Sequence, residues 1–286
     1  MVEEQRYLLP YIAVACGPSY ALFTSSGIFT VPCGVNRVRV LVVGGGGGGG
    51  SGAAGGGAAG SVKIGVFDVQ PNEALKVTVG KGGKGSTLKL GSCVQDSIAG
   101  ERSSFARLLR ADGGGNHSGS CFASWQGASG GSGGGEGCTN ETGRCRSGAG
   151  GSGGFNGNKS SGGRTYGVGS GQGAYAEQFK QFRFNLITSG AGGRGSVHDA
   201  PGGGGAGGVL INDNSPIAGS GAKPSGAEGG RGYGSGGGSG FLELEDDKAA
   251  PIHNEGGKGA DGVVYVEWWW ENPTRKSPSI TLQSTI

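Results

Sequence analysis

The sequence predicts a mainly β protein with little α-helix, in which a β-sandwich is joined to a bundle of extended polyglycine helices. Glycine supplies 71 of the 286 residues, against a usual share of about 7%. Proline supplies only 10 residues and no strict Gly-X-Y period occurs, which excludes a collagen triple helix. Apolar, β-branched segments flank the glycine tracts, and the tracts are poor in the polar residues of flexible linkers. We therefore expect the tracts to be ordered.

Five segments carry strand patterns. In residues 37–43, Val38, Val40 and Val42 share one face and the two arginines share the other, which is the alternation of a half-buried strand. The five segments are residues 28–32, 37–43, 62–69, 75–79 and 263–270, with a turn at 70–73. They divide the chain into an N-terminal arm or first strands (1–27), a β-rich part with the first glycine tract (28–111), a polyglycine region with display loops (112–262), a closing strand (263–272) and a polar tail (273–286).

The glycine tracts predict polyglycine helices that bond sideways. A three-fold helix of the polyproline II type has no internal hydrogen bonds, so its N–H and C=O groups point outward. Each sideways bond contributes about 0.5–1.5 kcal/mol, whereas ordering one residue costs about 1–2 kcal/mol. One such helix alone is therefore unstable, and we expect several side by side, anchored by the sandwich. Residues 179–187 fit either a helix or a strand.

Composition and motifs argue against an enzyme. The net charge is only +3 and no basic run occurs, so nucleic acid is not an expected partner. The Gly-x-Gly-x-x-Gly in 44–50 is followed by more glycine and alanine rather than by a helix, which excludes the dinucleotide-binding pattern. Three isolated histidines, no CxxC motif and no calcium-loop order around the acidic run 243–247 predict no catalytic residue, no metal and no cofactor.

Six cysteines and three sequons fit an exposed, loop-rich protein. Cys138 and Cys145 bracket a short polar loop that a disulfide would close. Free buried thiols are the alternative, especially for Cys33 beside a proline. Asn116, Asn140 and Asn158 lie in N-glycosylation sequons.

Trp268, Trp269 and Trp270 end the last predicted strand. Strand alternation puts Trp268 and Trp270 on the face of Val264 and Val266, and Trp269 on the other face. Because aromatic residues are enriched in cores and interfaces, we expect these side chains in the core and in a contact with a subunit or capsid partner. Stacking on a sugar is the alternative.

Several segments resemble a known family. The run from Phe29 to Val35, which leads into 38–43 and the glycine run, is similar to the opening of the glycine-rich domain of phage tail-tip and tail-fibre proteins. Other similar segments are 103–111, 202–212, 230–234 and 262–267. The same order occurs in extracellular glycine-rich proteins of invertebrates and large DNA viruses, and anaplastic lymphoma kinase-type receptors carry a more distant likeness. The resemblance implies a jelly-roll-like sandwich fused to a polyglycine bundle, used for binding or display.

These observations predict a non-enzymatic structural or adhesive protein of a virus particle surface, such as a minor capsid, spike or fibre-tip component. It would present loops around 116–160 for host attachment. Its expected partners are other virion or matrix proteins and a cell-surface receptor or glycan, and we expect an oligomer without a membrane span. The cysteines depart from the usual phage pattern and favour a eukaryotic virus. The alternative is a secreted matrix or receptor-ectodomain module, although residues 1–16 make a poor signal peptide.

Overall fold

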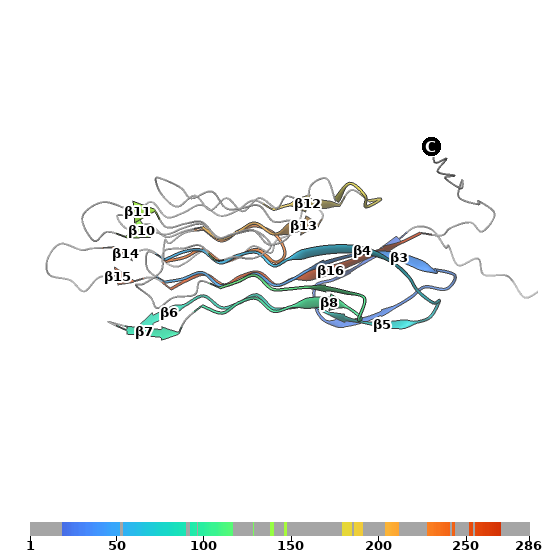
Figure 1. Cartoon of the computed structure of the whole chain (residues 1–286), viewed down its shortest axis with the longest axis horizontal. Helices are drawn as coiled ribbons and strands as arrows, with labels where there is room; N and C mark the ends of the chain where they lie inside the picture. The colour runs from blue at the N-terminus through green and yellow to red at the C-terminus, as the bar shows by residue number, and fades with distance from the viewer. Residues whose placement is uncertain are drawn as a thin grey trace, which may run out of the picture.

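The computed structural model is a long molecule with two four-stranded sheets at one end (Figure 1). It describes residues 19–51, 54–89, 92–95, 97–116, 128, 138–139, 146–147, 179–184, 186–190, 204–211, 228–240, 242–243, 252–253 and 255–269. The described part is mainly β, as the sequence predicts, with antiparallel pairing in each sheet.

Sheet A has the strand order β1-β16-β3-β4. Its strands are β1 (Ser19–Phe23), β16 (Val263–Trp268), β3 (Arg37–Val43) and β4 (Val62–Asp68). Strand β1 lies inside the segment predicted as an arm or first strands. Strand β3 is not half-buried as expected, because Leu41 and Val43 on its second face are also fully buried.

Sheet B has the order β2-β5-β8-β9. Its strands are β2 (Gly27–Thr30), β5 (Ala74–Thr78), β8 (Ser103–Phe105) and β9 (Leu109–Ala111). The predicted turn before β5 is confirmed, since the Glu73 N–H donates to the Gln70 carbonyl at 3.1 Å. Asn72 has a φ of 65° there, a conformation that asparagine tolerates well.

Four two-stranded sheets complete the described strands. They are β6 (Thr87–Lys89) with β7 (Ser92–Gln95), β10 (Cys138–Thr139) with β11 (Arg146–Ser147), β12 (Ile187–Ser189) with β13 (Val209–Ile211), and β14 (Leu242–Glu243) with β15 (Ile252–His253). Residues 179–187, whose pattern fitted either a helix or a strand, contain turns followed by the start of a strand. The described residues 179–184 form turns, in which the Phe182 N–H donates to the Phe179 carbonyl, and β12 begins at Ile187.

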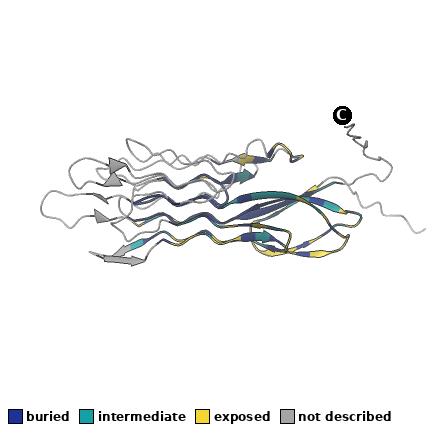
Figure 2. Ribbon diagram, viewed as in Figure 1, coloured by how far each residue is buried: buried dark blue, intermediate teal, exposed yellow. Residues whose placement is uncertain are grey.

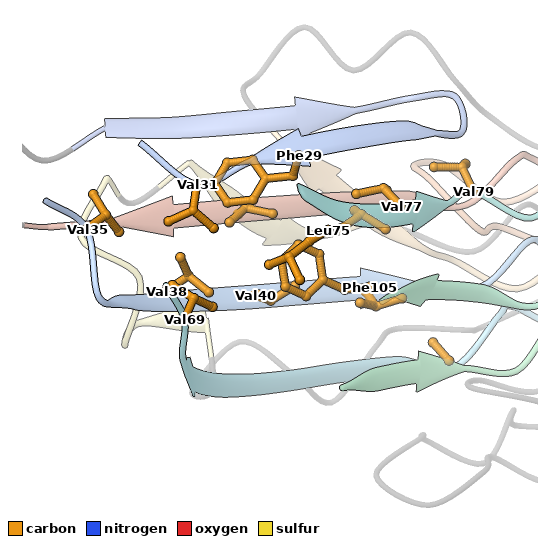
Figure 3. Close-up of a cluster of buried hydrophobic side chains, with 14 residues drawn as sticks. Phe29, Val31, Val35, Val38, Val40, Val69, Leu75, Val77, Val79 and Phe105 are labelled. Atoms are coloured by element: carbon orange, nitrogen blue, oxygen red, sulfur yellow. The ribbon is translucent and has the colours of Figure 1, made fainter. Parts of the chain in front are cut away.

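Two hydrophobic clusters bury the two faces of sheet A. The first lies against sheet B and is built around Phe29, Val40 and Phe105 (Figure 3). The second lies on the opposite face, where Phe179, Phe182 and residues of β12 and β13 cover Leu41 and Tyr265. Sheet A is therefore a central layer, and we call sheets A and B together the base.

The first cluster makes the stability of the base depend on Phe105, which is fully buried with its ring centroid 6.0 Å from that of Phe29. We expect Phe105→Ala to lower the free energy of unfolding by about 3–5 kcal/mol, because it removes buried surface and leaves a cavity. Ile28→Ala is the control, because Ile28 is 65% exposed, and it should cost less than about 1 kcal/mol. Urea unfolding followed by tryptophan fluorescence measures both values, and equal losses would contradict the assignment of the core.

Candidate functional site: the glycine shaft and the tip hairpins

The strands of the base continue directly into glycine-rich segments that run side by side along the molecule (Figure 1). Strands β3, β5 and β9 lead outward into 44–50, 80–86 and 112–116. Strands β4, β8 and β16 are entered from 54–61, 97–101 and 255–262. We call these segments, together with 204–208 and 228–240, the shaft.

Backbone N–H groups of 44–50 donate to three neighbouring segments in turn, and the cycle repeats every three residues. Gly44, Gly47 and Gly50 donate to 54–61, at 2.9–3.1 Å. Gly45 and Gly48 donate to 97–101, and Gly46 and Gly49 donate to 255–262, at 2.8–3.0 Å. All three accepting segments run antiparallel to 44–50, because each step of three along the donor is a step of three back along the acceptor.

The carbonyl groups of the same segment accept from three further neighbours. Gly83 and Ser86 donate to Gly46 and Gly49, Gly114 donates to Gly45, and Gly237 and Gly240 donate to Gly47 and Gly50. The described bonds in these three pairs lie between 2.8 and 3.0 Å. Residues 44–50 are thus surrounded by six hydrogen-bonded segments, three that accept and three that donate.

The register of the sheets passes unbroken into the shaft. Val43 is opposite Val62 on β4, and the next N–H groups out, Gly44 and Gly47, donate to Ser61 and Ala58, so the residue numbers of each pair still sum to 105. The β3–β16 pairing continues in the same way, with Val43 opposite Val263 followed by Gly46 to Ala260. The strand pairing in the base therefore determines which shaft segments meet and at which residues.

Only glycine fits the central segment. A β-carbon added at any residue from Gly44 to Gly49 would lie 1.9–2.2 Å from a backbone carbonyl oxygen of a neighbouring segment. Such an oxygen belongs to backbone held by its own hydrogen bonds, so it cannot move aside without breaking them. The glycine content is therefore a packing requirement of the shaft.

Charged side chains occupy outward positions of the outer shaft segments. Lys81 Nζ lies 2.9 Å and Lys258 Nζ 3.4 Å from the Asp261 carboxylate, which also accepts the Gly82 N–H at 2.8 Å. Burial alone would raise the pKa of Asp261, but the Gly82 N–H and the two ammonium groups hold that pKa below its ordinary value. The hydrogen bond and charge of Asp261 raise the pKa of Lys81.

Side chains also cap backbone N–H groups at this side of the shaft. The Lys81 N–H donates to Glu101 Oε2 at 3.1 Å, and the Gly80 N–H donates to Ser103 Oγ at 2.9 Å. Glu101 and Asp261 thus accept the N–H groups of Lys81 and Gly82, which have no backbone acceptor among the described shaft segments. The Gly80 N–H differs, because it lies in the same three-residue row as Gly83 and Ser86, which donate to 44–50, and Ser103 accepts it in the interior.

Three hairpins lie at the end of the shaft away from the base (Figure 1). They are the pairs β6–β7, β10–β11 and β14–β15, and we call them the tip hairpins. The predicted display loops 116–160 contribute β10 and β11 to this end. The remainder of those loops lies outside the described residues, apart from 116 and 128.

The structure separates the tryptophans that the sequence grouped. Trp268 packs against the first cluster, with its ring centroid 5.5 Å from that of Phe29. Trp269, on the opposite face as alternation predicts, contacts two guanidinium groups, with its ring centroid 4.9 Å from Arg39 Cζ and 4.7 Å from Arg183 Cζ. Trp270 lies outside the described residues, and a partner contact of these tryptophans stays a prediction.

Sequence reasoning missed Glu267, which is the fully buried carboxylate beside this stack. Arg39 Nη1 lies 3.0 Å from its Oε1, and the Arg183 N–H donates to its Oε2 at 3.1 Å. Arg39 also donates to the Gln181 carbonyl. The ion pair therefore fastens residues 181–183 to sheet A. Alternation indicated only that Glu267 shares the face of Tyr265, and the partners are far away in sequence.

The other predicted site residues are only partly described. The Asn116 side-chain amide is half-buried and donates to the Ser97 carbonyl at 2.5 Å, so a glycan there would compete with this bond. Asn140, Asn158 and Cys145 lie outside the described residues, and the Cys138–Cys145 disulfide and the glycosylation sites stay predictions. Cys33 is a free thiol and is exposed, so the expectation that it is buried was wrong. The tight Pro32–Val35 turn, closed by a 3.1 Å backbone bond, places Cys33 at the surface.

Within the described ranges, no group of three or more histidine, cysteine or acidic side chains is placed to hold a metal ion. The same ranges contain no helix that is long and apolar enough to cross a membrane.

A family model described as a glycine-rich domain matches residues 24–269. The matched range includes almost all of the base, the shaft and the tip hairpins. It confirms the resemblance to a glycine-rich domain family that the segments from Phe29 onward predicted. No curated protein matches the chain.

The close packing of the shaft predicts a severe effect of Gly46→Ala, whose β-carbon would lie 1.9 Å from the Ser235 carbonyl oxygen. We expect the free energy of unfolding to fall by at least about 3 kcal/mol. Amide exchange should become faster in 44–50 and in the segments that are hydrogen-bonded to it. Gly27→Ala is the matched control, since its β-carbon would come no closer than 3.8 Å to Phe23. Slow exchange retained across 44–50 in Gly46→Ala would show that this packing is wrong.

The lowered pKa of Asp261 predicts how the shaft responds to acid. Because the folded-state pKa lies below the unfolded value of about 3.9, the ionised carboxylate stabilises the fold above that pH and loses this contribution as pH falls through the folded pKa. Asp261→Asn should therefore cost about 0.5–1 kcal/mol at pH 7, less in high salt, and the difference from wild type should vanish near pH 2. Denaturant unfolding at several pH values measures this, with Asp68→Asn, at a carboxylate that is 80% exposed, as the control. A difference that grows in acid would refute the assignment.

Proposed function

Because the chain belongs to the glycine-rich domain family, we propose that it is a non-enzymatic structural and adhesive protein. Its shaft is a bundle of polyglycine II helices that holds the tip hairpins away from the base. The observation that carries the proposal is the three-residue cycle of hydrogen bonds around 44–50, continuous with the strands of the base.

A polyglycine II bundle accounts for the three-residue cycle. An extended helix with three residues per turn directs successive N–H groups about 120° apart, so each neighbour is reached by every third residue. The six neighbours of 44–50 use both its donors and its acceptors. Each bond contributes about 0.5–1.5 kcal/mol and is shared by two residues, so the bundle gains about one bond per residue. This gain approaches the ordering cost of about 1–2 kcal/mol per residue, which the anchoring strands reduce further.

Such a bundle is suited to display. At about 3.1 Å per residue, residues 44–50 alone would span about 20 Å between the base and the tip hairpins. Loops at the tip would then be presented at a fixed distance and orientation. This arrangement suits binding to a cell-surface receptor or glycan.

We place this display protein on the surface of a virus particle, as a minor capsid, spike or fibre-tip component. The exposed free thiol of Cys33 supports assembly in a reducing compartment, where thiols stay reduced. The alternative, a secreted matrix or receptor-ectodomain module, is favoured by the three sequons. Non-reducing mass spectrometry and the proteome of purified particles distinguish the virion protein from the secreted module. A chain that carries glycans and disulfides and is absent from particles would be the secreted module.

The display function predicts that the tip, rather than the base, determines cell binding. Residues 244–251 can be replaced by Asn-Gly, which joins β14 to β15 by a two-residue turn and leaves the shaft unchanged. We expect this variant to lose at least about ten-fold in binding to a panel of cultured cells, measured by flow cytometry with the fluorescently labelled chain. Asn72→Gly, in a base turn whose positive φ suits glycine, is the control and should bind like wild type. If tip replacements at each of the three hairpins leave binding intact, the proposal fails.

A further inference from the structure

Among the described residues, the outer face of sheet B is basic and carries no carboxylate. Alternation directs Phe29, Leu75 and Val77 into the first cluster, so the intervening residues of β2 and β5 face outward. The outward positions of the four strands are Ile28, Thr30, Ala74, Lys76, Thr78, Ser104 and Arg110, and the β8–β9 turn adds the exposed Arg107 and Leu108.

Three cations on this face have no acidic partner. Lys76, Arg107 and Arg110 are exposed, and none of their side chains forms a hydrogen bond or ion pair within the described part of the chain. The flanking carboxylates are already engaged: Asp112 lies 2.7 Å from Arg102, and Glu73 accepts the Gln70 N–H at 3.1 Å. Three neighbouring cations without an acidic partner are unusual in a chain with 24 basic and 21 acidic residues.

The register brings the cations together. Lys76 accepts a backbone bond from Ala106, the residue before Arg107, and Arg110 pairs through Ser104 with Thr78, two residues along β5 from Lys76. With strands about 4.8 Å apart and a rise of about 3.3 Å per residue, Lys76 and Arg110 are roughly 12 Å apart at the backbone. This separation is about one and a half Debye lengths at physiological salt, so a partner must bring an anionic group close to each cation.

Two large aliphatic side chains lie among these charges. Ile28, directly opposite Lys76 in the β2–β5 ladder, is 65% exposed, and Leu108 is 43% exposed. In Figure 2 the exposed residues of β5 lie on the outer side of the base, at the end of the molecule away from the tip hairpins.

We propose that this face is a docking surface for an acidic protein surface that also offers apolar side chains. Exposed aliphatic residues beside arginine suit a protein interface, where apolar contacts are surrounded by charge pairs. Sugar recognition uses aromatic rings for stacking, and none of the outward positions is aromatic. The proposal rests on the proposed function, because it assigns the attachment of the base to the particle or matrix while the tip remains free.

The probe is a glutamate–leucine copolymer, tested against heparin and phosphatidylserine vesicles by biolayer interferometry on the immobilised full chain. We expect saturable binding of the copolymer that is at least about ten-fold weaker in the variant K76E/R107E/R110E and weakens with salt. The matched control K84E/K180E/R231E makes the same change of net charge elsewhere and should bind within about two-fold of wild type. I28S/L108S, which keeps the charge, should also weaken copolymer binding.

Three outcomes would overturn the proposal. Tighter binding of heparin or of vesicles than of the copolymer would assign the face to a polysaccharide or a membrane. Equal losses in the two triple variants would show a nonspecific charge effect. Unchanged binding in I28S/L108S would remove the apolar component. Thermal unfolding of each variant establishes that it folds. Because cell binding through the tip is measured separately, failure here and failure of the display function are distinguishable.

Discussion

A backbone carbonyl oxygen occupies the space where a β-carbon of the central shaft segment would be, and the rest of the structure depends on this close approach. At 1.9–2.2 Å from the ideal β-carbon positions of Gly44 to Gly49, the neighbouring backbones exclude every side chain. The same distance lets N–H and C=O groups bond sideways on all sides. Glycine costs extra backbone entropy on folding, and bonding to six neighbours is the interaction that offsets this cost. Side chains such as Lys81 and Lys258 occur only in outer segments, at exposed positions.

The base supplies what the shaft cannot specify for itself. A run of glycines has no side-chain pattern to select its partner or register, and such segments are prone to slip. The antiparallel pairing of β3 with β4 and β16 is selected by buried side chains, and the continuing bonds from Gly44 to Ser61 and from Gly46 to Ala260 keep the same register. Hydrophobic burial in the base thereby stabilises the register of described shaft segments such as 44–50, which carry no large apolar side chain.

Local patterns predicted strands β2, β3, β4, β5 and β16 and the sideways bonding of glycine, because these depend on a period of two or on the absence of side chains. Short strands such as β8, β9 and β13 were not predicted. Local patterns could not predict contacts between distant segments. The burial of Glu267 depends on Arg39 and Arg183, which lie 228 and 84 residues away, and the second covered face of β3 depends on β12 and β13. The tryptophans were expected in the core and in a partner contact, and the pattern did not indicate that two guanidinium groups of the chain itself contact the ring of Trp269. Cys33 was expected to be buried because it follows a proline, and that pattern did not indicate the turn that places the side chain at the surface.

The width of the shaft depends on whether each outer backbone N–H group donates to a carbonyl of a further segment or to a side-chain oxygen. An uncapped row of backbone donors would pair with other chains, as the edge of a sheet does. Glu101 and Asp261 supply side-chain oxygens to the N–H groups of Lys81 and Gly82, so near the base these two donors are already capped. The backbone hydrogen bonds between shaft segments lie between the base and the tip hairpins. They depend on the register in which the chain re-enters the shaft after a tip loop, and not on the sequence of that loop. Tip loops of different sequence are therefore compatible with one shaft, which separates the part that determines rigidity from the part that we propose contacts a partner.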